Sequence, residues 1–166
     1  MTDKFQLFRL PYVALREVLN HAEPEVILSL SLCSKRSKRL LKHCQGPRKE
    51  ISITLNIPEN VLTVNILAAS ISVAAVSSLP KDLETVNIGS HVVPVEMKDG
   101  ILKTYWLDGK EGLEEVIKHT SDVFSRNLYS IEFYEPVLTE DVKDWLEWIK
   151  TIRVVHKFLS FLILEV

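Results

Sequence analysis

The stretch "LPYVALREVLNHAEPEVILSLSLCSKRSKRLLK", residues 10–42, decides the fold of the N-terminal part of the chain. Pro11 opens a run of apolar residues at helical spacing, and proline suits a first helical turn because its missing N–H would have no partner there. The dipeptide "EP" and then Ser34 precede two further apolar runs and indicate two more helix starts. The stretch therefore predicts three short helices, the first over residues 11–20 and the third over residues 35–42.

These three helices carry many apolar side chains for so small a unit. Eleven Val, Ile and Leu residues lie between Val13 and Leu41. A module of this size is only marginally stable alone, because it buries too little surface. We therefore expect the rest of the chain or another protein to cover the excess.

A second unit is predicted to begin after "QGPRKE", residues 45–50, where Gly46 and Pro47 interrupt helices. The next segment, "ISITLNI", alternates apolar and polar residues, as a strand with one buried face does. Residues 61–80 are strongly apolar but contain Asn65 and four serines, so we interpret them as buried strand or helix, with a membrane span as the less favoured alternative.

The remainder predicts more strands and two helices. Strands are expected at residues 85–88, 92–97 and 129–134. An Asp99-Gly100 turn favours a hairpin, residues 110–126 form an amphipathic helix that covers the sheet, and Thr139 caps a final helix. The predicted fold class is α+β, with an N-terminal three-helix unit followed by a small mixed strand and helix region.

Composition and charge exclude several classes of protein. The chain has 166 residues, 46% of them hydrophobic and 25% charged, as in an ordinary globular domain, and its net charge of −2 gives no overall attraction to nucleic acid or anionic membranes. Two cysteines without metal-site spacing and the lack of a signal peptide favour a reducing compartment, the cytoplasm and/or the nucleus.

No catalytic, cofactor or metal motif is recognisable. We expect Cys33 to be a small buried hydrophobe and the pair His43 and Cys44 to be exposed at a helix end. The five histidines fall on separate segments without metal-ligand spacing, there is no phosphate-binding loop, and the acidic residues of the second half are expected on solvated helix faces. The sequence therefore predicts a protein that is not an enzyme and takes no cofactor or metal.

The basic run "KRSKRLLKHCQGPRK", residues 35–49, holds seven Lys and Arg and no acidic residue. Such a run can track phosphates or act as a nuclear localisation signal, so a nucleic-acid-binding module is an alternative function. The predicted helix after Ser34 is only about two turns long and lacks a base-reading array. We favour a solvated or partner-facing surface, with no nucleic acid or membrane as partner.

With these residues laid out, the opening segment resembles an F-box, which we place at residues 5–45. The matching features are Leu10-Pro11, Leu15, the pair Val18 and Leu19, the stretch Glu25 to Ile27, "LSLCS" at residues 30–34, and the basic helix from Lys35 to Leu40. This resemblance implies an adaptor that docks on a Skp-type protein and, through it, on a cullin ubiquitin ligase. The partner-binding residues it implies, some at the interface and some in the local core, are Leu10, Pro11, Leu15, Val18, Leu19, Ile27, Leu30 and Cys33.

Residues 50–166 resemble the beginning of the F-box-associated (type 2) region of nematode-type F-box proteins. Proteins of that kind are usually longer, so this resemblance implies a C-terminally truncated, partial region. The function implied is the substrate-recognition subunit of a Skp-cullin-F-box ligase with an unknown protein target, or a truncated product without productive target binding.

Overall fold

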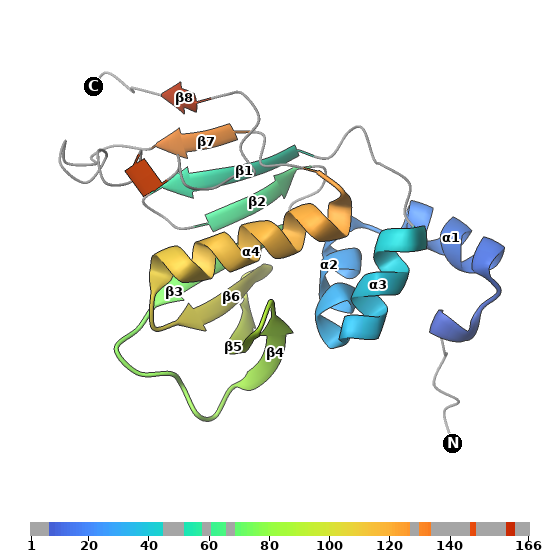
Figure 1. Ribbon diagram of the computed structural model, residues 1–166, viewed down its shortest axis with the longest axis horizontal. Coiled ribbons are helices and arrows are strands. Elements are labelled where there is room, and N and C mark those ends of the chain that lie inside the picture. The colour runs from blue at the N-terminus through green and yellow to red at the C-terminus, as the bar shows by residue number, and fades with distance from the viewer. Residues whose placement is uncertain are drawn as a thin grey trace.

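The computed structural model describes residues 7–44, 52–57, 61–65, 69–126, 130–133, 147–148 and 159–161. Three helices precede a mixed sheet that is crossed by one long helix, so the fold is α+β, as the sequence predicted (Figure 1). The first elements are the short 3-10 helix η1 (Leu7–Arg9) and the helices α1 (Tyr12–His21), α2 (Pro24–Cys33) and α3 (Lys35–Cys44). We call residues 7–44 the three-helix module.

The helix starts follow the predicted signals. Pro11 lies directly before α1, and Pro24 is the first residue of α2. The Ser34 hydroxyl caps α3, because its Oγ accepts a hydrogen bond from the backbone N–H of Ser37 at 3.0 Å. The helix α3 continues to Cys44, two residues beyond the predicted end.

Replacement of the capping serine, Ser34→Ala, is expected to lower the free energy of unfolding by about 1 kcal/mol, because a backbone N–H of the first turn loses its acceptor. Urea denaturation followed by circular dichroism measures this. Ser29→Ala, at an exposed position within α2, is the matched control and should change stability much less. Equal losses in the two variants would contradict the capping role.

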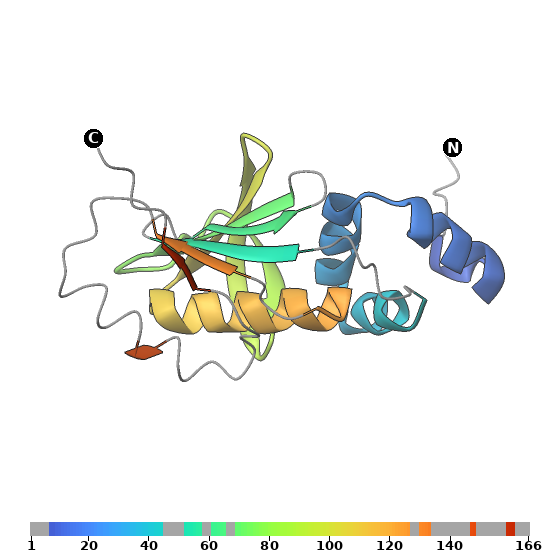
Figure 2. The ribbon, with the colours of Figure 1, turned by 90° about the horizontal axis from the view of Figure 1, so that it is seen from above.

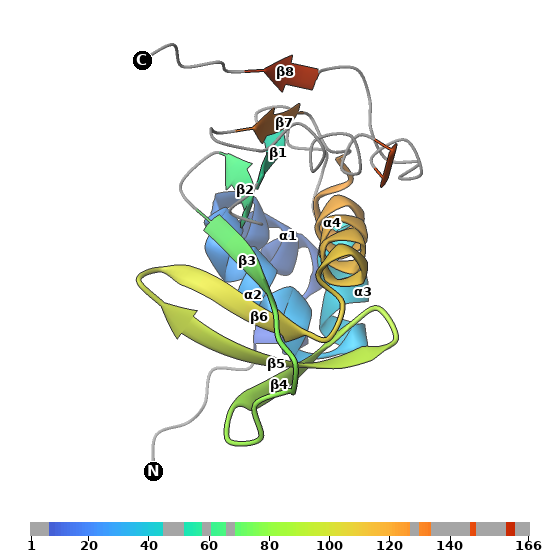
Figure 3. The same ribbon diagram turned by 90° about the vertical axis from the view of Figure 1, so that its left-hand side faces the viewer.

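Within the described residues, eight strands form one mixed sheet in the order β4-β5-β6-β3-β2-β1-β7-β8. The strands are β1 (Ser52–Ile57), β2 (Val61–Asn65), β3 (Ala69–Ala75), β4 (Glu84–Ile88), β5 (His91–Lys98), β6 (Ile101–Trp106), β7 (Ser130–Phe133) and β8 (Leu159–Phe161). The pairs β3–β6, β1–β7 and β7–β8 are parallel and the other pairs are antiparallel. Figure 3 follows this order from β4 and β5 at the bottom to β8 at the top.

The predicted strands and hairpin turn are observed. The apolar segment 61–80 contains β2 and β3. At the tip of the β5–β6 hairpin, Asp99 has φ 51° and Gly100 has φ 77°, so both central residues are left-handed, as a tight two-residue hairpin requires. The predicted helix after Thr139 falls mostly outside the described residues, although residues 147–148 are helical.

The long helix α4 (Gly109–Phe124) lies along one face of the sheet (Figure 2). Its predicted apolar stripe is buried, and Asp108 caps it by accepting hydrogen bonds from the backbone N–H groups of Lys110 and Glu111. Gly112 allows α4 to approach the sheet closely, because a Cβ there would lie 2.5 Å from Cγ of Trp106. This helix therefore covers the sheet as predicted.

We call the described residues from Ser52 onward the sheet region. Its buried side chains and those of the three-helix module form one continuous core. Leu19, Ile27 and Leu41 belong to the same cluster as Ile71 and Leu113. The module packs through α2 against β3, β4 and α4, and through α3 against α4. Part of the apolar excess of the helices is thus covered by the rest of the chain.

Two expectations about cysteines are wrong. Cys33 is exposed, because the buried face of α2 is formed by residues at other helical positions, among them Ile27 and Ser31. Cys44 is buried, because it lies on the same face of α3 as Ser37 and Leu41. Burial raises the pKa of the Cys44 thiol, against the opposing charge of the Arg16 guanidinium, and so favours the neutral form.

Candidate docking surface

Several large apolar side chains on α1 and α2 are exposed to solvent. The exposed fractions are 56% for Tyr12, 76% for Val13, 46% for Val18 and 47% for Val26. The helix α1 packs against α3 and extends away from the sheet (Figure 2). Among the described residues, four other large apolar side chains are exposed outside these helices: Leu79, Val92, Met97 and Leu107. Exposed apolar side chains that lie together on one surface are typical of a site that binds another protein.

An apolar groove adjoins these helices, between η1, α2 and α3. Its volume is about 460 Å³, and Leu7, Phe8, Leu30 and Leu40 contribute its apolar wall, with Arg36 beside them. The sequence analysis did not predict Leu7 and Phe8 as site residues. They belong to the apolar segment "FQLF", which ends one residue before the Leu-Pro dipeptide. The groove gives an apolar side chain of a partner a place to insert.

The eight residues predicted to bind a partner divide into three groups. Leu15, Leu19 and Ile27 are buried in the core; Leu10 and Leu30 are half-buried against it; Pro11, Val18 and Cys33 are exposed. The sequence analysis did not single out Tyr12, Val13 and Val26 as site residues. Helical phase does not identify all of them, because Tyr12 lies three and seven positions before the buried Leu15 and Leu19, on their side of α1, and is nevertheless exposed.

A buried hydrogen bond joins the module to α4. Nε2 of His119 lies 2.8 Å from Oγ of Ser31, and that hydroxyl donates its proton to the carbonyl oxygen of Leu28 at 2.6 Å. Because a hydroxyl has one proton, we assign the hydrogen of the imidazole to Nε2, which donates to Ser31. Burial lowers the pKa of His119 to about 4, helped by the Lys38 ammonium and opposed by the Asp122 carboxylate.

The Ser31 and His119 pair has the spacing of a nucleophile and its base, but its arrangement is structural. A general base must accept the serine proton, whereas His119 donates to Ser31. The Ser31 side chain is also buried, and its hydroxyl proton is already donated to the Leu28 carbonyl. The pair therefore holds α2 against α4.

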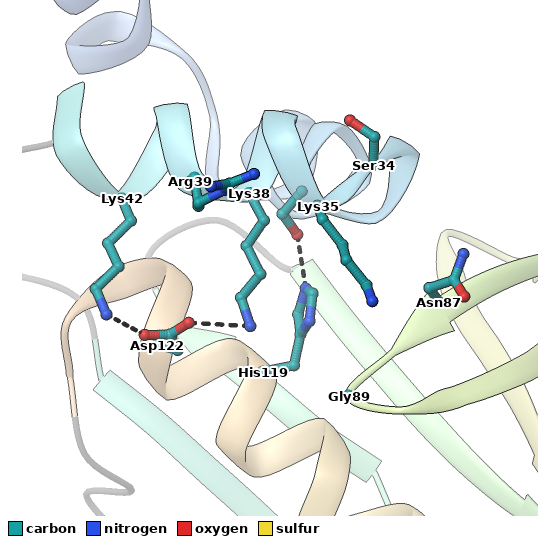
Figure 4. Close-up of a pocket in the computed structure, with 10 residues that line it drawn as sticks. Ser34, Lys35, Lys38, Arg39, Lys42, Asn87, Gly89, His119 and Asp122 are labelled. Atoms are coloured by element: carbon teal, nitrogen blue, oxygen red, sulfur yellow. Dashed lines mark hydrogen bonds and ion pairs between the residues drawn. The ribbon is translucent and has the colours of Figure 1, made fainter.

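Two ion pairs strengthen the same junction. The Asp122 carboxylate on α4 pairs with Lys38 on α3, with 3.0 Å between Nζ and Oδ2, and with Lys42 one turn further along (Figure 4). Partial burial acts to raise the pKa of Asp122, but the two lysines outweigh it and hold this pKa below its usual value. Two lysines of the basic run are thus ion-paired within the protein. Asp122, which the sequence analysis expected on a solvated helix face, is their partner.

A metal site and a membrane-spanning helix find no support in the described part of the chain. There, no group of three or more His, Cys, Asp or Glu side chains is placed to hold a metal ion. Among the same residues, no helix has both the length and the apolar character of a membrane span.

Comparison with known proteins supports the resemblance of the opening segment. The family model for the F-box domain matches residues 7–49, which include η1 and the helices α1 to α3. No curated protein and no solved structure matches the chain. The match supports an F-box domain at these residues and, in general terms, the adaptor role of such domains, which bind Skp-type proteins of cullin ligases and are generally not catalytic.

Proposed function

We propose that this protein, which carries an F-box domain at residues 7–49, is the substrate-recognition subunit of a Skp-cullin-F-box ubiquitin ligase. The observation that carries the proposal is the coincidence of this domain with exposed apolar side chains on its first two helices. The protein acts without catalysis or cofactor, in the cytoplasm, the nucleus or both.

In the proposed division of the chain, residues 5–45 are the F-box and residues 50–166 are a partial F-box-associated region that holds the target. The Skp-type adaptor contacts the exposed members of the predicted set, such as Val18, together with the apolar groove beside Leu30. The buried members, such as Ile27, act indirectly, because they keep the helices in the orientation that presents this surface.

The junction with α4 supports the receptor role physically. A continuous core, the hydrogen bond between Ser31 and His119, and the ion pairs of Asp122 connect the F-box to the sheet region. A target bound to the sheet region would therefore be held at a defined orientation to the ligase, since a rigid connection limits the positions that it can occupy.

Binding to a Skp-type adaptor tests the proposal. The double variant Val18→Glu with Val26→Glu is expected to bind at least tenfold more weakly than the wild type, because two carboxylates would lose water in an apolar interface. Co-purification and titration calorimetry measure this. Both side chains are about half exposed, so the free protein should remain folded by circular dichroism.

The matched control is Val92→Glu with Met97→Glu, which adds the same two charges at exposed apolar positions of β5. This control should bind the adaptor as the wild type does. The proposal fails if the wild type does not bind, or if the two double variants bind equally well.

A further inference from the structure

A second pocket lies between α3, α4 and the turn that joins β4 to β5. Its volume is about 340 Å³, and four cationic side chains of α3 line it: Lys35, Lys38, Arg39 and Lys42. In Figure 4 the Lys35 and Lys38 side chains extend from α3 toward the His119 side chain of α4. The pocket thus collects four positive charges from one helix at the junction between the F-box and the sheet region.

The positive charge of this pocket is only partly compensated. Asp122 is the one carboxylate among the described residues that line it, and it pairs with Lys38 and Lys42. Within the described part of the chain, Lys35 and Arg39 have no ion-pair partner. The pocket therefore has an excess of positive charge, although the whole chain has a net charge of −2.

The other lining groups suit an anion. The side chain of Asn87 on β4 also lines the pocket and offers amide N–H donors, and it has no hydrogen-bond partner among the described residues. His119 is neutral at physiological pH, because burial lowers its pKa to about 4, and its Nε2 hydrogen is committed to Ser31. The free cations of Lys35 and Arg39 together with the Asn87 amide therefore supply the available donors.

We propose that this pocket binds the phosphate group of a phosphate-bearing anion between α3 and the β4–β5 turn. The Arg39 guanidinium has the planar fork that recognises two phosphate oxygens, and the Lys35 ammonium adds a point charge. Such an anion would connect the F-box to the β4–β5 turn, and by binding only the folded protein it would raise thermal stability. Free small phosphates and a phosphorylated peptide side chain present the same dianion.

The first experiment uses pyrophosphate as the probe, with the full-length protein alone and ionic strength held constant. Pyrophosphate should bind the wild type by titration calorimetry and raise its melting temperature, whereas sodium chloride of equal ionic strength should not. The double variant Lys35→Gln with Arg39→Gln should bind at least tenfold more weakly, because it removes both unpaired cations of the pocket.

The matched control is Lys81→Gln with Lys98→Gln, which changes the net charge equally at exposed positions outside the pocket. It should bind pyrophosphate as the wild type does. Absence of pyrophosphate binding to the wild type, or equal binding by the two double variants, overturns the proposal. Binding of duplex DNA that depends on Lys35 and Arg39, without binding of pyrophosphate, also overturns it and indicates a nucleic-acid surface.

A second comparison identifies the source of the phosphate group. A phosphoserine peptide that binds more tightly than pyrophosphate, and whose unphosphorylated form does not bind, supports a peptide-borne phosphate in the pocket. Tighter binding of pyrophosphate supports a free small anion. Both assays omit the Skp-type adaptor, so their failure is independent of the adaptor-binding test.

Discussion

Ile27→Ala is expected to lower the free energy of unfolding of the isolated protein by about 3 kcal/mol. The Ile27 side chain is fully buried on α2, within the cluster that joins the F-box to the sheet region, so its removal leaves a cavity in the shared core. Urea denaturation in the absence of any partner measures the change. The prediction separates a role in the core from a role in direct contact with the adaptor.

Val18→Ala is the control for this prediction. The Val18 side chain on α1 is 46% exposed, so its truncation should change stability by only about 0.5 kcal/mol. It should instead weaken binding to the Skp-type adaptor, if Val18 lies in that interface. Unfolding of Ile27→Ala at the same urea concentration as Val18→Ala would show that Ile27 is not part of the core of the free protein.

Acidification from pH 7.5 to pH 5 is expected to cost the folded protein about 2 kcal/mol through His119. The pKa of His119 is about 4 in the folded state and near 6.5 in the unfolded chain, so the unfolded state binds more protons between these values. Stability from this group is fully present above pH 6.5 and declines as the pH falls toward 4. Thermal melts across this pH range measure the loss.

His119→Gln should remove this contribution, because a glutamine amide has no such titration and can still donate a hydrogen bond to Ser31. The neighbouring Asp122 carboxylate does not replace it, because its pKa is lowered from an ordinary value that already lies below this pH range. If the variant loses stability with acid as steeply as the wild type, the buried neutral His119 is not the cause.

Local signals in the sequence were enough to predict the helices, most of the strands and the F-box. Pro11 and Ser34 mark helix starts, and the Asp99-Gly100 dipeptide specifies a hairpin. The apolar stripe of α4 is likewise a pattern within one segment. Each of these features depends on backbone preferences or on the spacing of neighbouring residues. Both are local properties of a short segment and need no tertiary contacts.

Features that join distant segments were decided only by the folded structure. Ser31 and His119 are 88 residues apart, and nothing at either position indicates the other. Helical spacing could not tell which apolar residues of the F-box become core and which remain exposed, because the covering surface comes from β3, β4 and α4. The phosphate pocket has the same origin: the sequence supplies the basic helix α3, but only tertiary packing places Asp122 and Asn87 against it and leaves Lys35 and Arg39 unpaired among the described residues.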